Sequence, residues 1–237
     1  GVDSSVAAAL LKARGDDVVG VHMRCYNVDG CAEQDAEDAR RAAETLGIPF
    51  YTFDFEEEYK KKVVEYMVDG YRRGITPNPD VMCNREIKFG LFLKKALALG
   101  AEYVATGHYV WREPEFPISN LQFANKKRKK LGNSKIENLL KTENYKLKIA
   151  KDKNKDQSYF LWTLTQNELR YCLFPIGEYT KPQVRKLAKK FGLTNADKKD
   201  SQGICFLGQV TLSDFLKNYI PERKGKIVSR SGEKIGT

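Results

Sequence analysis

The chain has 237 residues, 41% of them hydrophobic, and 41 Lys/Arg against 31 Asp/Glu give it a net charge of +10. This hydrophobic fraction excludes wholesale disorder, and no apolar run approaches the roughly 20 residues of a membrane span. The five cysteines have irregular spacing, which argues against a disulfide framework and favours a reducing compartment.

The excess positive charge is concentrated in one segment. Residues 126–155 hold 12 Lys/Arg and 3 Asp/Glu, so the rest of the chain is close to neutral. A patch of this kind releases counterions when it binds a phosphate backbone, which suggests RNA or DNA as a partner. The alternative is a solvated insertion rich in Lys and Asn.

The first half of the chain alternates between strand and helix patterns. Short apolar runs predict strands at 18–23, 50–54 and 103–106. Helical spacing ended by Gly or Pro predicts helices at 33–46, 59–72 and 87–99. The alternation predicts an α/β fold in which helices cover both faces of a parallel sheet. Ligands bind beyond the carboxyl ends of such strands, so we expect Gly1, Met23 and Gly107 on one rim.

The strand and helix pattern weakens after Trp111. We expect a basic inserted loop at 112–155, with a helix near 136–141. Order returns at Asp156. Thr180, followed three residues later by Gln183, predicts a capped helix that ends at Gly192.

The opening Gly1-Val2-Asp3-Ser4-Ser5 has no methionine before it, so we expect the chain to be part of a longer protein. It leads into the helix-forming residues 6–11, and a glycine turn before a helix N-terminus is an anion site. Backbone N–H groups and hydroxyls would hold a pyrophosphate there, and the Asp3 carboxylate would help to hold Mg²⁺. An Asp/Ser helix cap is the alternative. The Walker A pattern is absent.

In two further stretches a cysteine lies close in sequence to a residue that could serve a reaction, a carboxylate in one and a glycine in the other. In 76–84 two prolines predict a rigid surface loop that presents Asp80 and Cys83 together. In 199–206 Gly203 is followed two residues later by Cys205. If Cys83 and Cys205 meet in the fold, they could alternate between two thiols and a disulfide. The alternative for each cysteine is a buried, inert thiol.

The remaining cysteines and histidines give weaker signals. Cys25, Cys31 and Cys172 lack such a context, and we expect structural roles for them. His108 follows Thr106-Gly107 and either lines the rim or makes a structural hydrogen bond. No spacing predicts a zinc site.

Together these stretches resemble the tRNA-uridine 2-sulfurtransferases, or tRNA 2-thiouridylases, of the PP-loop ATP pyrophosphatase superfamily. The superfamily motif is S-G-G-x-D-S, and Gly1-Val2-Asp3-Ser4 matches its last four positions. In family order and over nearly the whole chain, the resemblance continues through residues 78–84, 105–109, 155–159, 174–177 and 200–206.

The resemblance implies a role for each matched group. The residues that would contact ATP are Gly1, Val2, Asp3, Ser4, Ser5, Met23 and Gly107. Those that would receive the target base are Asn78, Pro79 and Asp80, and those that would touch the tRNA are Lys155, Asp156 and Gln157. Cys205 would carry a persulfide sulfur from a sulfur-relay or cysteine desulfurase donor protein. Cys83 would complete the transfer, and Asp80 is the candidate general base.

The implied reaction is ATP-dependent 2-thiolation of the wobble uridine of tRNA. ATP would adenylate the uracil C2 oxygen, and Mg²⁺ and loop amides would stabilise the departing pyrophosphate. The Cys205 persulfide would attack C2, and Cys83 would then form a disulfide with Cys205 as AMP leaves. Two other functions stay open: an ATP-dependent amidotransferase or ligase acting on a small molecule, and a non-catalytic RNA-binding module.

The resemblance also implies a domain arrangement and a location. We expect residues 1–207 to form the PP-loop nucleotide-binding and catalytic domain. Residues 208–237 would begin a central domain and a linker toward a C-terminal β-barrel that lies outside this sequence. The long basic segment before Lys155 is similar to that of eukaryotic organellar members, so we expect a mitochondrial protein, with the bacterial cytoplasm as the alternative.

Overall fold

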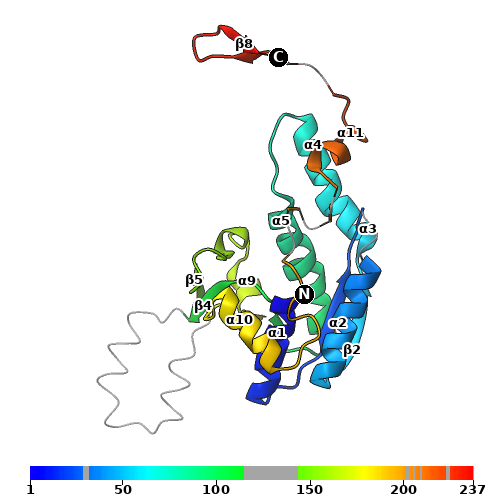
Figure 1. Ribbon diagram of the computed structural model, residues 1–237, viewed down its shortest axis with the longest axis vertical. Helices are drawn as coiled ribbons and strands as arrows, with labels where there is room; N and C mark the ends of the chain where they lie inside the picture. The colour runs from blue at the N-terminus through cyan, green and yellow to red at the C-terminus, as the bar shows by residue number, and fades with distance from the viewer. Residues whose placement is uncertain are drawn as a thin grey trace, which may run out of the picture.

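Two parallel pairs of strands lie at the centre of the computed structural model (Figure 1), which describes residues 1–28, 32–114, 144–200, 203–204, 206–208, 210–222 and 225–236. Strand β1 (Gly20–Arg24) pairs with β2 (Phe50–Asp54). Strand β3 (Val104–Ala105) pairs with β6 (Cys172–Leu173). The strands predicted at 18–23, 50–54 and 103–106 are therefore confirmed, with shorter bounds at the first and last.

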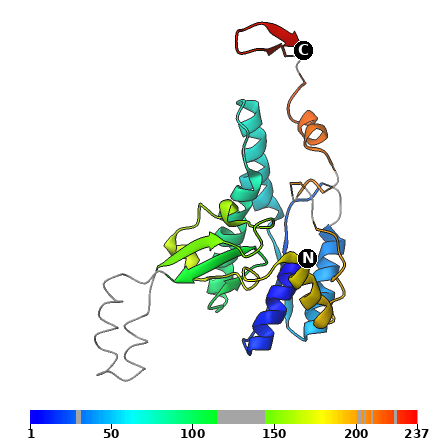
Figure 2. The same ribbon diagram turned by 60° about the vertical axis from the view of Figure 1, so that its left-hand side comes forward.

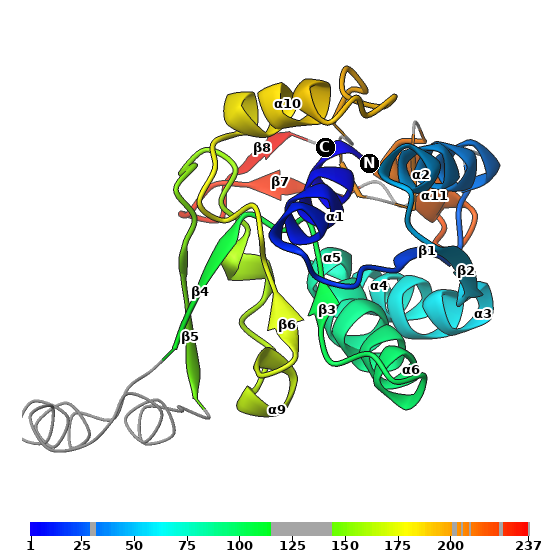
Figure 3. The same ribbon diagram turned by 90° about the horizontal axis from the view of Figure 1, so that it is seen from below.

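Helices cover both faces of these strands (Figure 3). On one side lie α1 (Val2–Arg14), α2 (Ala32–Leu46) and α10 (Lys181–Lys190). On the other side two helical runs follow each other: α3 (Glu56–Tyr59), η1 (Lys60–Val64) and α4 (Glu65–Arg72), then α5 (Pro79–Met82), η2 (Cys83–Phe92) and α6 (Leu93–Ala98). The predicted α/β fold is confirmed.

Helix α10 begins and ends where the sequence predicts. Thr180 is its N-cap, and Thr180 and Gln183 form a reciprocal capping box. Gly192 follows the helix with a φ of 68°, a left-handed conformation that favours glycine at a helix end.

Two other helices begin earlier than expected. Helix α1 starts at Val2 instead of near Val6, because Asp and Ser suit a first helical turn, where the dipole is positive. The prediction of a rigid loop at 76–84 is wrong from residue 79 onward. Asn78 accepts a hydrogen bond from the Val81 N–H at 3.1 Å, and Pro79 suits the first helical position, so the helix predicted at 87–99 already begins at Pro79.

Segments η1 and η2 are π-helical, and η2 extends over ten residues. Such wide turns are rare and occur often at functional sites. In η2 a Cβ atom at Gly90 would lie 2.7 Å from the Arg85 carbonyl oxygen, five residues earlier. A residue without a side chain is therefore required at this π-turn.

The bounds predicted for the inserted loop, 112–155, are too wide, because residues near both ends of this range form strands. Strands β4 (Val110–Pro114) and β5 (Tyr145–Ile149) are antiparallel and pair from Val110–Ile149 to Pro114–Tyr145. The helix expected near 136–141 lies outside the described residues, as does most of the basic segment.

The remaining elements are short. They are η3 (Ser158–Phe160), α9 (Gln166–Leu169), α11 (Leu212–Lys217), β7 (Ile227–Val228) and β8 (Lys234–Gly236). Strands β7 and β8 form an antiparallel hairpin beyond α11, far from α1 (Figures 1 and 2). In the described ranges no helix has the length and apolar character that a membrane crossing requires.

Four buried clusters of described residues hold these layers together, and two of them bear on the site. The first joins α1 to α10 and contains Val6, Ile176, Val184 and Ala188. The second lies around η1 and η2 and contains Tyr59, Val63, Met67, Cys83, Ile87 and Phe206. We call the second the thiol cluster.

Candidate functional site

The first-turn N–H groups of α1 have no partner within the helix, as an anion site requires. Gly1 is the N-cap, and no side chain caps the helix. Asp3, Ser4 and Ser5 form the first turn, so the Asp/Ser cap considered above is not present. The first-turn N–H groups and the positive end of the helix dipole point toward the same place.

Gly107 closes one side of this site. Directly after β3, its backbone lies so close to α1 that a Cβ atom there would stand 2.5 Å from the Ser4 nitrogen and 2.7 Å from the Asp3 carbonyl carbon. Only glycine fits this approach without a shift of the backbone. The structure thus brings the predicted residues Asp3, Ser4 and Gly107 together at the carboxyl end of a strand.

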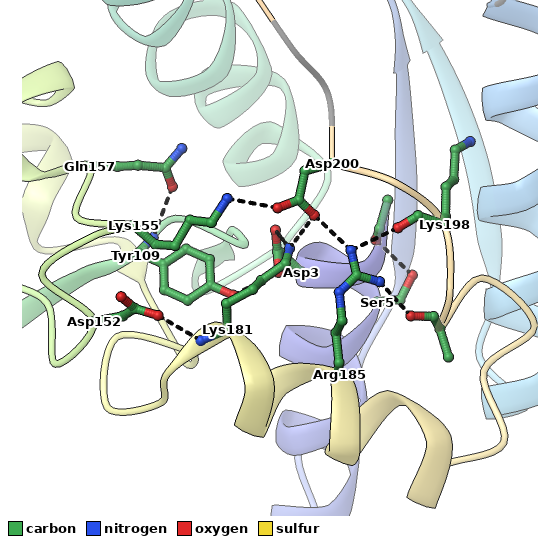
Figure 4. Close-up of polar contacts among 12 residues, drawn as sticks. Asp3, Ser5, Tyr109, Asp152, Lys155, Gln157, Lys181, Arg185, Lys198 and Asp200 are labelled. Carbon is green, nitrogen blue, oxygen red and sulfur yellow. Dashed lines mark hydrogen bonds and ion pairs between the residues drawn. The ribbon is translucent and has the colours of Figure 1, made fainter.

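The Asp3 carboxylate is held by Lys181 (Figure 4). The sequence predicts for Lys181 only a place at the start of a helix. The Lys181 ammonium donates to both Asp3 oxygens at 2.8 Å, and its side chain is only 11% exposed. The Tyr109 hydroxyl donates to Asp3 at 2.9 Å. Burial, together with the Asp3 charge, raises the pKa of Tyr109 well above its ordinary value.

Asp200 extends this network to a second part of the chain. It accepts from Lys181 at 2.7 Å, from Lys155 at 2.8 Å and from Arg185 at 3.0 Å. Burial alone would raise the pKa of Asp200, but the hydrogen bonds from Lys155 and Lys181 outweigh it and lower the pKa to about 2. We call Asp3, Asp200, Lys155, Lys181 and Arg185 the charge cluster.

Ser5 has a different environment from Ser4. The Ser5 hydroxyl donates to the Gly1 carbonyl at 3.1 Å and accepts from the buried Asn195 amide at 3.0 Å. Ser4 is exposed. The Ser5 hydroxyl therefore shapes the turn, and Ser4 is the hydroxyl open to a ligand.

The residues predicted to touch tRNA also have partners within the chain. Asp156 accepts from the Ala150 N–H and the Ser158 hydroxyl, at 2.8 and 2.7 Å, and Gln157 accepts from the Tyr109 N–H at 3.0 Å. Lys155 belongs to the charge cluster, and its side chain is 42% exposed. Of the three, Lys155 is therefore the side chain best placed to meet a partner.

Asp80 and Cys83 lie on one helical run and are both at least partly buried. Burial raises the pKa of the Asp80 carboxyl above its ordinary value, and the Lys88 charge opposes this rise. A raised pKa suits a carboxylate that accepts a proton. Cys83 is 4% exposed and lies in the thiol cluster.

The thiol cluster contains Cys83 and one chain neighbour of Cys205, and the other chain neighbour packs against the cluster. Phe206 is a buried member of the cluster, and Ile204 and Met23 pack against it. Cys205 itself lies outside the described residues, as does Cys31. No disulfide joins two of the three described cysteines, Cys25, Cys83 and Cys172.

His108 and Cys172 have structural positions. His108 is 7% exposed, shares a 2.8 Å hydrogen bond with Thr106 and packs against Phe89 and Phe174. Burial lowers its pKa well below the ordinary value. Cys172 is fully buried, and burial raises the pKa of its thiol to about 12. The structural alternative therefore holds for His108.

The residues around Asp3 do not form a Mg²⁺ site. Both Asp3 oxygens are bonded to the Lys181 ammonium, which already neutralises them. Within the part of the chain that is described, no three His, Cys, Asp or Glu side chains gather as metal ligands would. Asp3 would have to release the Lys181 ammonium before either of its oxygens could bind Mg²⁺.

Comparison with known proteins points to one family. The family model described as "tRNA methyl transferase HUP domain" matches residues 1–209. The chain is 46% identical to "tRNA-specific 2-thiouridylase MnmA" of Akkermansia muciniphila over 243 residues, which cover 100% of this chain and 61% of that protein. It is 48% identical to "tRNA-specific 2-thiouridylase MnmA 1" of Geobacillus kaustophilus, covering 100% of this chain and 58% of the relative.

A third relative carries the same name as the first. "tRNA-specific 2-thiouridylase MnmA" of Flavobacterium johnsoniae is 48% identical over 235 residues, covering 96% of this chain and 54% of the relative. The chain thus spans between 54% and 61% of the length of these three proteins.

Proposed function

The chain belongs to the family of the tRNA methyl transferase HUP domain, and from this premise we propose that it is the nucleotide-binding part of a tRNA-uridine 2-sulfurtransferase. The relatives' names support thiolation and not methylation. Two observations carry the proposal: a helix N-terminus closed by Gly107, and a thiol cluster that contains Cys83 together with one chain neighbour of Cys205, while the other packs against it.

In this proposal ATP activates the uracil C2 oxygen by adenylating it. The first-turn N–H groups of α1 bind its phosphates, and Gly107 lets the chain after β3 approach this turn. Met23, the last residue but one of β1, packs against the thiol cluster and contacts the nucleotide. Asn78, Pro79 and Asp80 receive the base, and the raised pKa of Asp80 suits it to accept a proton.

The sulfur step uses both thiols. The outer sulfur of a Cys205 persulfide forms a bond to C2, and the Cys83 thiolate then attacks the inner sulfur. The persulfide S–S bond breaks, a Cys83–Cys205 disulfide forms, and the C2 oxygen leaves with AMP as C2=S forms. A thiol reductant must reduce this disulfide before the next cycle.

The proposed partners follow from the same reaction. tRNA is the substrate, and Lys155, Asp156 and Gln157 contact it. A donor protein supplies the persulfide sulfur. We propose residues 1–207 as the nucleotide-binding domain and 208–237 as the beginning of a central domain. The three relatives are bacterial, which favours the bacterial cytoplasm over the mitochondrion expected from the basic segment.

The test uses the full-length protein with ATP, tRNA and a persulfide donor, and mass spectrometry of tRNA nucleosides. Wild type is expected to form 2-thiouridine. C83S is expected to release pyrophosphate with tRNA but to form no 2-thiouridine, whereas C172S, in which a structural cysteine is changed, keeps the activity. Absence of 2-thiouridine with wild type contradicts the proposal. Pyrophosphate release that needs neither tRNA nor Cys83 would indicate a ligase acting on a small molecule.

A further inference from the structure

We propose that Lys181 is the side chain that binds the ATP phosphates at the N-terminus of α1, and that Asp3 serves to hold Lys181 in place instead of binding Mg²⁺. This inference rests on the proposed nucleotide site and assigns residues within it.

The position of Lys181 is set by its backbone and its side chain. Its N–H donates to Asp152 at 2.8 Å, and Thr180 caps α10 directly before it. Its ammonium lies between Asp3 and Asp200 and 5.9 Å from the centre of the Tyr109 ring. A buried lysine ammonium is costly unless carboxylates pair with it. Asp3 and Asp200 therefore keep the Lys181 ammonium inside the protein, whereas a lysine without such partners would turn toward solvent.

This position lies next to the anion site. Asp3 belongs to the first turn of α1, and side chains in a helix tilt toward its N-terminus. The ammonium bonded to Asp3 therefore stands at the end of the helix where the unbonded N–H groups point. A phosphate that meets those N–H groups is also within reach of Lys181.

The charge cluster allows Lys181 to change partners. An ammonium has three donors, which Asp3 and Asp200 share in the structure. When a phosphate takes one of them, Asp200 keeps Lys155 and Arg185, and Asp3 keeps the Tyr109 hydroxyl. The cluster holds three cations and two carboxylates, so one positive charge is left for the phosphates.

The test measures binding of inorganic pyrophosphate and ATP to the full-length protein by calorimetry, with EDTA present and no Mg²⁺. K181Q is expected to weaken pyrophosphate binding at least tenfold. K189Q is the matched control: Lys189 lies on the same helix, is 61% exposed and pairs with Asp197, and its loss leaves the affinity unchanged. D3N is expected to lower the affinity less than K181Q does, because the ammonium loses one carboxylate that holds it in place but keeps Asp200.

A second variant covers the case in which K181Q does not fold because Asp3 is left without its cation. D3N/K181Q removes both partners, while Asp200 keeps Lys155 and Arg185. It is expected to bind pyrophosphate at least tenfold more weakly than D3N. Thermal unfolding of each variant verifies that it is folded.

Each outcome decides a different point. Equal pyrophosphate affinity in D3N and D3N/K181Q overturns the role of Lys181, even if wild type binds ATP and thiolates tRNA. The titrations of wild type and D3N are repeated with Mg²⁺ in place of EDTA, and a D3N defect seen only in that repeat overturns the role of Asp3 and makes it a metal ligand. If wild type binds ATP and pyrophosphate, with Lys181 required, but forms no 2-thiouridine, this inference stands and the proposed function fails.

Discussion

The backbone of Gly107 lies against that of Asp3, so closely that a Cβ atom at position 107 would stand 2.7 Å from the Asp3 carbonyl carbon. Gly107 has no positive φ, so the required feature is space and not an unusual backbone conformation. The close approach ties the end of β3 to the first turn of α1.

Replacing Gly107 by Ala is expected to push these two segments apart. Overpacking of this kind costs about 1–3 kcal/mol in the free energy of unfolding, and the shifted N–H groups should lower ATP affinity about tenfold or more. Urea unfolding and calorimetry measure the two effects. G225A is the matched control, because nothing lies within 4 Å of a Cβ atom at Gly225. A G107A protein that matches G225A in both measurements would contradict this account.

Asp200 should contribute to stability above acidic pH. Its pKa is lowered from 3.8 to about 2, so its ion pairs stabilise the fold at neutral pH and are lost as the pH falls from about 4 to about 2. The shift corresponds to about 2 kcal/mol. D200N should therefore unfold about 2 kcal/mol more easily than wild type at pH 7, with a smaller difference near pH 3. D197N changes a carboxylate that is 81% exposed and should have little effect. A pH-independent difference would refute the ion-pair explanation.

Asp80 should limit activity at low pH. As the proposed base it must be ionised, and its pKa is raised, so 2-thiouridine formation should decline as the pH falls through a value above the ordinary carboxyl range. D80N should lose activity about 100-fold or more. D69N, which changes an exposed carboxylate paired with Arg73, should keep it.

Stability should respond to Asp80 in the opposite direction. A group whose pKa is raised by burial stabilises the fold only while it is protonated, and this contribution disappears as the pH rises through the raised pKa. D80N should therefore be at least as stable as wild type at pH 7, as thermal unfolding will measure. A less stable D80N would indicate that the ionised carboxylate has a structural partner.

The described cysteines should differ in reactivity. Cys25 is partly exposed, whereas Cys83 is 4% exposed and Cys172 is fully buried. In the folded protein iodoacetamide should label Cys25 first, and in urea all three should react alike. Mass spectrometry of the labelled peptides gives the order. Rapid labelling of Cys172 would contradict its raised pKa and its burial.

Elements that depend on neighbouring residues could be predicted from the sequence. Helix α10 is an example, because Thr180, Gln183 and Gly192 each act within a few residues. The pair Asn78-Pro79 was misread: two prolines suggested a loop, but Asn is a good N-cap and Pro a good first helical residue. The same local chemistry could have placed the helix start correctly.

Partners distant in sequence could not be predicted. Lys181 lies 178 positions from Asp3, and its sequence context shows only a helix start. Asn195 was missed for the same reason, although it bonds Ser5. A search for a counter-ion to Asp3 would have found many lysines, because 41 Lys/Arg are available. Only the packing of α10 against α1 selects one of them.

The ladder between β4 and β5 has a consequence for protein engineering. Five residue pairs, from Val110–Ile149 to Pro114–Tyr145, close the chain before and after residues 115–143. Because this ladder fixes the chain on both sides of that stretch, we expect Tyr109 and Lys155 to keep their positions when it is shortened or replaced by a reporter. The same ladder would let natural lineages vary the stretch while the charge cluster stays the same.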